Sequence, residues 1–318
     1  MFDWKKELAV SKLSPSEFVT KYYNEIEGPN RDAKLKRVKR ILGKLNRSTR
    51  TEEPKREIIY ENLYNPTTLN LNSTAKQITF GLISDTHFNS KYCQITYLNQ
   101  YYDLCKELGI KDIYHAGDID DGENMRPGHV YENYTQGADD HIIEIIKNYP
   151  MREGITTHFI TGNHDAAFRK HCGLDIGYQL ASRRLDFDYL GRDLAVINFT
   201  PKVSMMLKHP WSGSSYALSY RPQKIVEAME TSMEKKPTIL AIGHFHKFEY
   251  LFYHGIHCFQ TGCFQSATPF TIGKGISVAM GGWIITLDLD SEGNLLSITP
   301  KAVTFIDPVA EDYKNYNR

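Results

Sequence analysis

Histidine, aspartate and asparagine side chains cluster at five points of this 318-residue sequence, each directly after a stretch that is predicted to be a strand. The clusters share imidazole, carboxylate and amide groups and contain no thiolate. They are Asp85-Thr86-His87, Gly117-Asp118 with Asp121, Gly162-Asn163-His164-Asp165, Lys208-His209-Pro210 and Gly243-His244-Phe245-His246. Open α/β sheets bind their ligands beyond the carboxyl ends of the strands, so these side chains are expected to meet there.

A mixed set of oxygen and nitrogen donors suits Mn²⁺, Fe²⁺ or Zn²⁺ better than Ca²⁺, which prefers oxygen alone, or a structural cysteine-rich zinc site. Residues two apart in an extended segment point to the same side. Asp85 and His87 are therefore expected to form one pair, and His244 and His246 another, each able to hold one ion or two adjacent ions. Burying so many charged and polar groups together would be costly without cations.

The central cluster allows two interpretations. Asn163 could ligate a metal through its amide oxygen, His164 could donate a proton near that metal, and Asp165 could fix the tautomer of the imidazole. The same residues also suit an ordinary turn, because Gly and Asn tolerate left-handed backbone and Asp bonds nearby backbone groups. The tetrapeptide alone does not separate these interpretations; its context has to.

Strands and helices alternate around the clusters, which favours an α/β (α+β) fold with parallel pairing and a β-rich, partly antiparallel end. Helices are predicted at 92–108, 138–149, 168–184 and 221–235. Strands are predicted at 78–84, 110–116, 156–161, 194–199, 203–207, 238–242, 248–253, 256–260, 282–289 and 295–305. We expect one main domain over 77–318, preceded at 51–76 by a linker or an excursion over the surface.

Residues 1–50 are predicted to form a small helical unit that ends in a basic amphipathic helix. Between Arg31 and Arg50 there are nine basic residues and one acidic residue. Such a unit is similar to a helix-turn-helix, in which a basic helix contacts nucleic acid. The alternative is a solvated helix that docks on the main domain by its leucines. The candidate nucleic-acid contacts are Lys36, Arg37, Lys39, Arg40 and Lys44.

Composition narrows the class of protein. A hydrophobic fraction of 41% suffices for a packed core, and a charged fraction of 24%, with no apolar run long enough to span a bilayer, argues against a membrane protein. The N-terminus has no apolar stretch of the signal-peptide type, so a cytoplasmic location is expected. Five cysteines without a Cys-x-x-Cys pair are expected to be reduced and mostly buried.

In order along the chain, Asp-x-His, Gly-Asp-x-x-Asp, Gly-Asn-His-Asp, His and Gly-His-x-His resemble the five signature blocks of the calcineurin-like metallophosphoesterase superfamily, over roughly residues 78–318. The resemblance implies a four-layer αββα sandwich of two mixed sheets with a dinuclear metal site. It implies that one metal is held by Asp85, His87 and His246, and the second by Asn163, His209 and His244, with Asp118 bridging them. Mn²⁺ is the ion expected in vitro, with Fe, Zn or Ni as alternatives.

The implied activity is hydrolysis of a phosphoester. Two cations about 3.5 to 4 Å apart can deprotonate a shared water to a bridging hydroxide and neutralise charge on the phosphate. By resemblance, His164 is the acid for the leaving alkoxide and Asp165 orients it. Asp121 is expected to brace a ligand or a loop from behind, with plain capping as the alternative.

The substrate class stays open at this point. Asp165, rather than Glu, in the central block is similar to the SbcD-type nuclease branch, although the usual DNA-capping domain is not apparent. With the basic helices it favours a phosphodiesterase or nuclease acting on nucleic acid. The alternative is a phosphomonoesterase, or a protein or small-molecule phosphatase, with the N-terminal helices as an interaction module. The segments 120–136, with Arg126, and 262–271, with Phe270, could overhang the metals, where aromatic side chains could stack on a base and the arginine could meet a phosphate.

Overall fold

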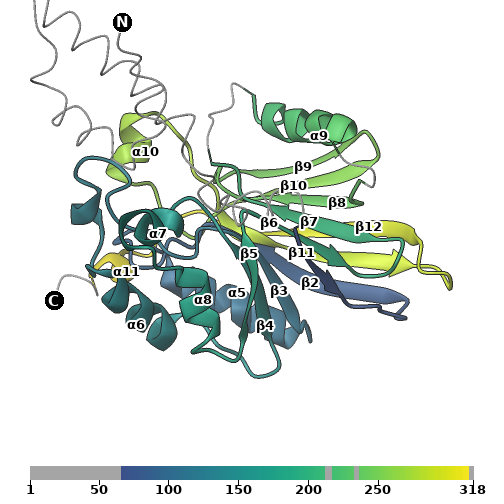
Figure 1. The fold of residues 1–318 in the computed structure, drawn as a ribbon, viewed down its shortest axis with the longest axis horizontal. Helices are drawn as coiled ribbons and strands as arrows, with labels where there is room; N and C mark the ends of the chain where they lie inside the picture. The colour runs from purple at the N-terminus through teal and green to yellow at the C-terminus, as the bar shows by residue number, and fades with distance from the viewer. Residues whose placement is uncertain (1–65, 212–216, 233–235, 315–318) are drawn as a thin grey trace, which may run out of the picture. The chain divides into compact units, whose positions relative to one another are not determined.

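The computed structural model describes residues 66–211, 217–232 and 236–314 (Figure 1). The predictions for the helical unit at 1–50, including its five candidate nucleic-acid contacts, and for most of 51–76 lie outside these residues. Two six-stranded sheets form the centre of the described part.

The first sheet has the strand order β12-β11-β2-β3-β4-β5. Its parallel strands are β2 (Gln77–Ile83), β3 (Asp112–Ala116), β4 (Thr156–Thr161) and β5 (Phe187–Arg192). The antiparallel strands β11 (Met280–Leu289) and β12 (Leu295–Phe305) extend it beside β2. Its outer face is covered by the helices α5 (Ile95–Glu107), α6 (Ala138–Asn148) and α8 (Ile176–Ala181) (Figure 1).

The second sheet has the order β1-β6-β7-β8-β10-β9. Its strands are β1 (Thr67–Asn70), β6 (Leu194–Asn198), β7 (Ser204–Lys208), β8 (Ile239–Ile242), β9 (Phe248–Tyr253) and β10 (Ile256–Thr261). Helix α9 (Tyr220–Ser232) covers its outer face (Figure 1). The layers therefore run helix, sheet, sheet, helix, and the expected four-layer sandwich of two mixed sheets is confirmed.

An apolar layer lies between the two sheets. The inner strands are buried on both faces, which is why their sequences are largely hydrophobic. Phe80 on β2 stacks on Phe199, which follows β6, with ring centroids 5.0 Å apart, and Tyr114 packs edge-on against both rings. Strands buried on both faces need apolar side chains in both directions. This layer fixes the sheets so that the loops after β2, β3, β4, β7 and β8 meet at one edge.

The main differences from the sequence-based expectations concern short elements. The helix predicted at 168–184 is two helices, α7 (Ala166–Cys172) and α8, because Gly173 adopts a left-handed conformation (φ 79°) and ends the first. Strand β1 lies within the range expected to be a linker and pairs with β6 in parallel. Strand β5 and the helices α10 (Pro269–Gly273) and α11 (Ala310–Lys314) were also not predicted.

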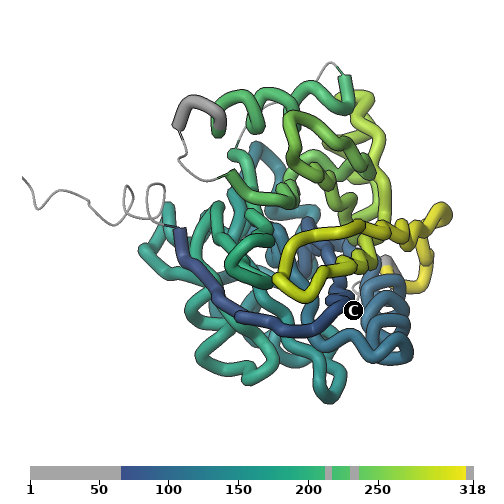
Figure 2. The backbone as a smooth tube through the Cα atoms, turned by 90° about the vertical axis from the view of Figure 1, so that its right-hand side faces the viewer, coloured from purple at the N-terminus to yellow at the C-terminus, as the bar shows by residue number. Residues whose placement is uncertain are grey.

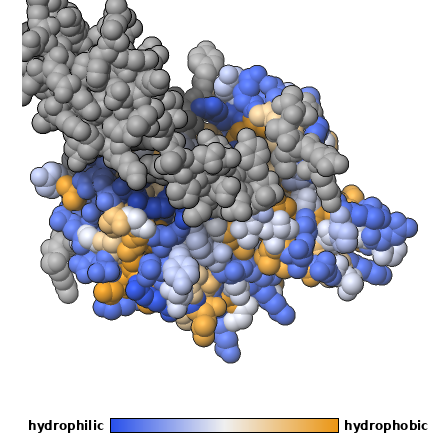
Figure 3. Space-filling view, in the orientation of Figure 1, coloured by the Kyte–Doolittle hydropathy of each residue, from blue (hydrophilic) through white to orange (hydrophobic). Residues whose placement is uncertain are grey.

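Helix α11, near the end of the described chain, packs against the start of α5, where Thr96 donates from its amide and hydroxyl to Asp312. Figure 2 shows the course of the backbone turned by 90° from Figure 1. The tip of the β11–β12 hairpin is hydrophilic (Figure 3). All five cysteines are free and only Cys172 is exposed, as expected. No helix among the described residues has the length and hydrophobicity needed to cross a membrane.

Candidate metal centre and active site

The loops after five strands bring the seven expected metal ligands into one place. Among the described residues, three groups of potential ligand atoms have all their members within 4.8 Å of one another. Two consist of expected ligands: a first group of Asp85, His87 and His246, and a second of Asp118, His209 and His244. The third is His87 with Asp121 and His164. Asn163 joins the second group, with its Oδ1 3.2 Å from His209 Nε2. The structure therefore brings together the side chains of each of the two expected ligand sets.

The backbone of these residues is unusual. Five of the seven have a left-handed conformation, with φ of 53° at Asp85, 45° at His87, 56° at Asp118, 78° at His244 and 53° at His246. Such conformations are uncommon in residues other than glycine and gather at functional sites. The expectation that pairs converge by strand alternation is therefore wrong, because β2 ends at Ile83 and β8 at Ile242, before either pair begins.

The first group has the donors and the space of a cation site. Asp85 Oδ1 is fully buried and accepts no hydrogen bond among the described residues, although His246 Nε2 lies 3.3 Å and His87 Nε2 3.7 Å from it. The two Nε2 atoms are 3.0 Å apart. Burial opposes ionisation of Asp85, but His246 and His87 hold its pKa well below the usual range. A carboxylate oxygen and two imidazole nitrogens directed at one point fit a divalent ion.

The second group also has a carboxylate oxygen and imidazole nitrogen held close together by hydrogen bonds to the surrounding loops. His209 Nδ1 donates to the carbonyl of Ala116 at 2.7 Å, which leaves the Nε2 lone pair facing Asp118 Oδ2 at 3.0 Å and Asn163. Asp118 Oδ1 accepts from the backbone amide of His164 at 2.8 Å. Although burial opposes it, the nearby His209 lowers the pKa of Asp118. A second hydrogen bond that fixes the tautomer of a histidine is a common feature of metal ligands.

Two glycines make room for this arrangement. A Cβ atom at Gly162 would lie 2.3 Å from Asp118 Oδ1 and 2.7 Å from His209 Nε2. A Cβ atom at Gly243 would lie 2.5 Å from the carbonyl oxygen of Ala116. Both glycines are therefore required by close approach rather than by turn conformation.

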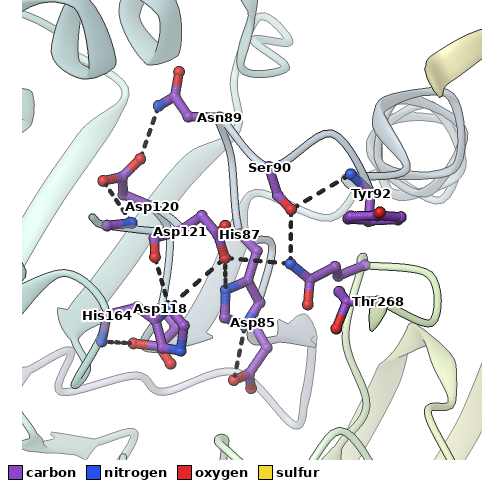
Figure 4. A network of polar contacts seen from close by, with 12 residues as sticks. Asp85, His87, Asn89, Ser90, Tyr92, Asp118, Asp120, Asp121, His164 and Thr268 are labelled. Carbon is purple, nitrogen blue, oxygen red and sulfur yellow. Dashed lines mark hydrogen bonds and ion pairs between the residues drawn. The ribbon is translucent and has the colours of Figure 1, made fainter. Parts of the chain in front are cut away.

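Asp121 supports the first group from behind. Its Oδ1 lies 2.9 Å from His87 Nδ1, so it fixes the ring with Nε2 directed at Asp85, and its backbone carbonyl accepts from His164 Nδ1 at 2.6 Å (Figure 4). His129 Nε2 lies 3.2 Å from Asp121 Oδ2, and Gln265 Nε2 lies 3.2 Å from Oδ1. The sequence interpretation missed His129 and the contact of Gln265, because neither matches a signature block and both come from other loops.

The His164 ring lies 4.6 Å from the His87 ring, measured between centroids, and its Nδ1 is hydrogen-bonded to Asp121 rather than to Asp165. The Asp165 carboxylate accepts from the backbone amides of Gly162, Ile119 and Asp120 at 2.8 to 3.3 Å. The expected Asp165–His164 hydrogen bond is therefore corrected: the carbonyl of Asp121 holds the imidazole, and Asp165 ties the loops after β3 and β4 together. Burial lowers the pKa of His164 to about 4, against the opposing effect of Asp118.

A cavity of about 600 Å³ adjoins the two groups. One end is formed by His87, Asp118, Asn163 and His164, and the rest of its wall comes from the loops after β3, β8 and β10. The cavity thus gives a ligand access to the candidate metal-binding side chains and to His164 together.

Residues 78–269 match the family model of the calcineurin-like phosphoesterase superfamily domain. The chain belongs to this superfamily. As a calcineurin-like phosphoesterase, it is a hydrolase acting on phosphoesters, and its two donor groups are candidate sites for the divalent metals typical of the family.

A search of curated proteins gave no match. Similar solved structures include an archaeal phosphodiesterase, at 12% identity and a TM-score of 0.39, covering 71% of this chain and 100% of that one. A 5'-nucleotidase precursor from Thermus thermophilus has 12% identity and a TM-score of 0.40, covering 76% and 57%. Vps29 from Entamoeba histolytica in complex with Zn²⁺ has 13% identity and a TM-score of 0.34, covering 71% and 99%.

Proposed function

We propose that this calcineurin-like phosphoesterase is a two-metal phosphodiesterase that acts on nucleic acid. The observation that carries the proposal is that two donor groups lie close together, with His164, whose amide donates to Asp118, beside them in the lining of one cavity. Asp85, His87 and His246 would hold one divalent ion, Asn163, His209 and His244 the other, and Asp118 would bridge them. When bound, the two ions, Mn²⁺ in vitro, supply an activated water and neutralise charge on the phosphate.

The protein's own groups orient the reaction. Asp121 keeps His87 in the ligating tautomer, and the Ala116 carbonyl does so for His209. His164 Nδ1 bonds to the Asp121 carbonyl, which leaves Nε2 for the substrate. A phosphate anion beside the ring would raise its pKa. His164 would then carry the proton that the leaving alkoxide requires.

Two features favour nucleic acid as the substrate. The segment from Arg31 to Arg50 carries nine basic residues, enough to neutralise several backbone phosphates, though it lies outside the described residues. The two cations of the cavity, Arg126 and Lys247, are each engaged, by Glu132 and by Ser277. A singly charged diester suits such a partly neutralised wall better than a doubly charged terminal phosphate.

The test is hydrolysis with Mn²⁺ over a panel of single- and double-stranded DNA and RNA, cyclic nucleotides and small phosphomonoesters. The wild type should cleave nucleic-acid diesters, and Asp118→Asn, which keeps the shape but removes the bridging charge, should lose this activity. Intact nucleic acid throughout the panel, with rapid turnover of a small monoester, would show that the enzyme is a phosphomonoesterase instead.

The contribution of the basic segment can be measured in the full-length chain. Replacing Lys36, Arg37, Lys39, Arg40 and Lys44 together by Gln should weaken binding to nucleic acid and flatten its dependence on salt, because fewer counterions are released. Turnover of a dinucleotide should stay unchanged. Unaltered affinity and salt dependence would show that the segment is a solvated face or an interaction module.

A further inference from the structure

The cavity beside the metal ligands is much larger than a phosphate group needs. Its volume of about 600 Å³ falls in the range of pockets that enclose an organic ligand of roughly drug size. One end carries the candidate metal ligands, whereas the outer part contains the apolar side chains of Met125, Phe245, Phe270 and Ile276 beside the cations of Arg126 and Lys247. A phosphate held at the metal-ligand end would therefore place its organic substituent against an apolar and aromatic surface.

Two of the walls of this outer part, those after β3 and β10, are held in position by their own contacts. The wall after β10 is fixed by Gln265, which donates to Ser90 Oγ at 3.0 Å, and by Thr268, which caps α10 together with Thr271. The wall after β3 is fixed by Asn133, whose side-chain amide donates to the Gly122 carbonyl at 2.7 Å. The outer cavity is thus built before a ligand arrives, which reduces the entropic cost of binding.

One contact joins the two walls. The Arg126 guanidinium lies 4.5 Å from the centroid of the Phe270 ring, and Glu132 holds the same guanidinium at 2.5 Å. The ring of Phe270 is 40% exposed, so the contact fixes its place without covering it. A fixed, partly exposed aromatic ring in a cavity wall is a suitable surface for stacking of a nucleobase.

We infer that the outer cavity binds one nucleoside attached to the scissile phosphate, with Phe270 as the stacking surface for its base. The inference rests on the proposed function and makes it narrower: the substrate is a nucleotide diester that presents a separable, unpaired base, as in a dinucleotide or at the end of a single strand. A base still paired within a duplex cannot enter a cavity that holds one nucleoside, and unstacking it costs free energy.

The experiment compares two kinds of substrate and four proteins. The substrates are the dinucleotide thymidylyl-thymidine and a set of its abasic counterparts, in which one base or the other is replaced by hydrogen. The proteins are the wild type, Phe270→Ala, Phe270→Trp and the matched control Ile272→Ala, whose side chain is 68% exposed on the same helix and does not line the cavity. Each kcat/KM is measured with Mn²⁺.

The wild type should cleave the dinucleotide about tenfold to a hundredfold faster than one of the abasic counterparts, as expected for one stacked base. Phe270→Ala should remove this preference by slowing the dinucleotide alone, Phe270→Trp should retain it, and Ile272→Ala should behave like the wild type. Equal losses of Phe270→Ala on all substrates, or no base preference in the wild type, would overturn the inference while leaving the proposed function intact. No cleavage of any nucleotide diester by the wild type would overturn the proposed function itself.

Discussion

His158 should make the stability of the protein depend on pH. It lies on β4 in the interior of its sheet, where Nε2 is 2.9 Å from Asp112 Oδ1 and Nδ1 is 2.7 Å from Asp188 Oδ2. The ring is almost fully buried and stacks on Tyr114 with centroids 5.1 Å apart. Burial opposes the charge, but the two carboxylates outweigh it and raise the pKa of His158 from 6.5 to about 9.

The direction and the size of the change in unfolding free energy follow from the difference in proton binding between the folded and unfolded states. Between pH 6.5 and 9 the folded state holds a proton that the unfolded state has lost, so the free energy of unfolding falls as pH rises through this window. The contribution is fully present below pH 6.5 and lost above 9. The pKa difference corresponds to about 3 kcal/mol at most. Because Asp112 and Asp188 are 40% and 43% exposed, solvent screening reduces the expected value to about 1 to 2 kcal/mol.

The assay is urea unfolding of the metal-free protein at about pH 6 and about pH 9.5, on either side of this window, for the wild type and for His158→Gln. Other groups also titrate, so the informative quantity is the difference between the two proteins in their change with pH. The wild type should lose about 1 to 2 kcal/mol more than His158→Gln. Asp188→Asn, which removes one of the two carboxylates, should give an intermediate loss. Parallel pH dependence of the wild type and His158→Gln would refute the reasoning.

Three further outcomes are expected. Gly162→Ala places a Cβ atom 2.3 Å from Asp118 Oδ1. The affinity of this variant for Mn²⁺, measured by calorimetry, should fall by about 10- to 100-fold while its circular dichroism spectrum stays unchanged. An unchanged affinity would contradict the argument that the Cβ atom displaces Asp118. Arg184→Met removes hydrogen bonds to the carbonyls of Ile145, Tyr149 and Pro150. It should lower the free energy of unfolding in urea by about 3 kcal/mol. A decrease under about 1 kcal/mol would show that water replaces the guanidinium. Removal of metal by a chelator should abolish hydrolysis, and Mn²⁺ at about 100 times its Kd should then stabilise the fold by about 2.7 kcal/mol for each bound ion in chemical denaturation. Equal stability with and without Mn²⁺ would exclude binding to the folded state.

Long strands and helices could be predicted from the sequence because each carries its own pattern. β4, β9 and β12 have the predicted bounds, and α5 and α6 differ only at their ends. The missed elements are those stabilised from outside. Strand β1 has four residues and exists by pairing with β6, and α10 is a single turn held by its capping box. Local sequence carries little information about such contacts.

The site shows the same limit at the level of single residues. The grouping of the seven candidate ligands could be predicted because their types recur after strands in a known order. The partner of His164 could not, because a carbonyl group such as that of Asp121 is present at every position and leaves no trace in the sequence. His129 was missed for a related reason: its importance lies in a contact with Asp121 across a loop, not in its neighbours along the chain.

Five candidate ligands have a left-handed backbone conformation, which explains why strand alternation did not predict their arrangement. The order and spacing of the motifs along the sequence did predict which residues come together. Each left-handed residue costs about 1 kcal/mol or more, so five of them store several kcal/mol in one edge of the fold. Neighbouring loops hold this conformation in place: the amide of Asp85 donates to Gly117, that of His87 to Asp118, and that of Phe264 to the carbonyl of Asp85. The strained positions are bound to one another rather than to the strands before them. The sequence spacing of these residues therefore reflects contacts among the loops of the site and not the geometry of the sheet. Their left-handed conformation is maintained only because all the loops contact one another.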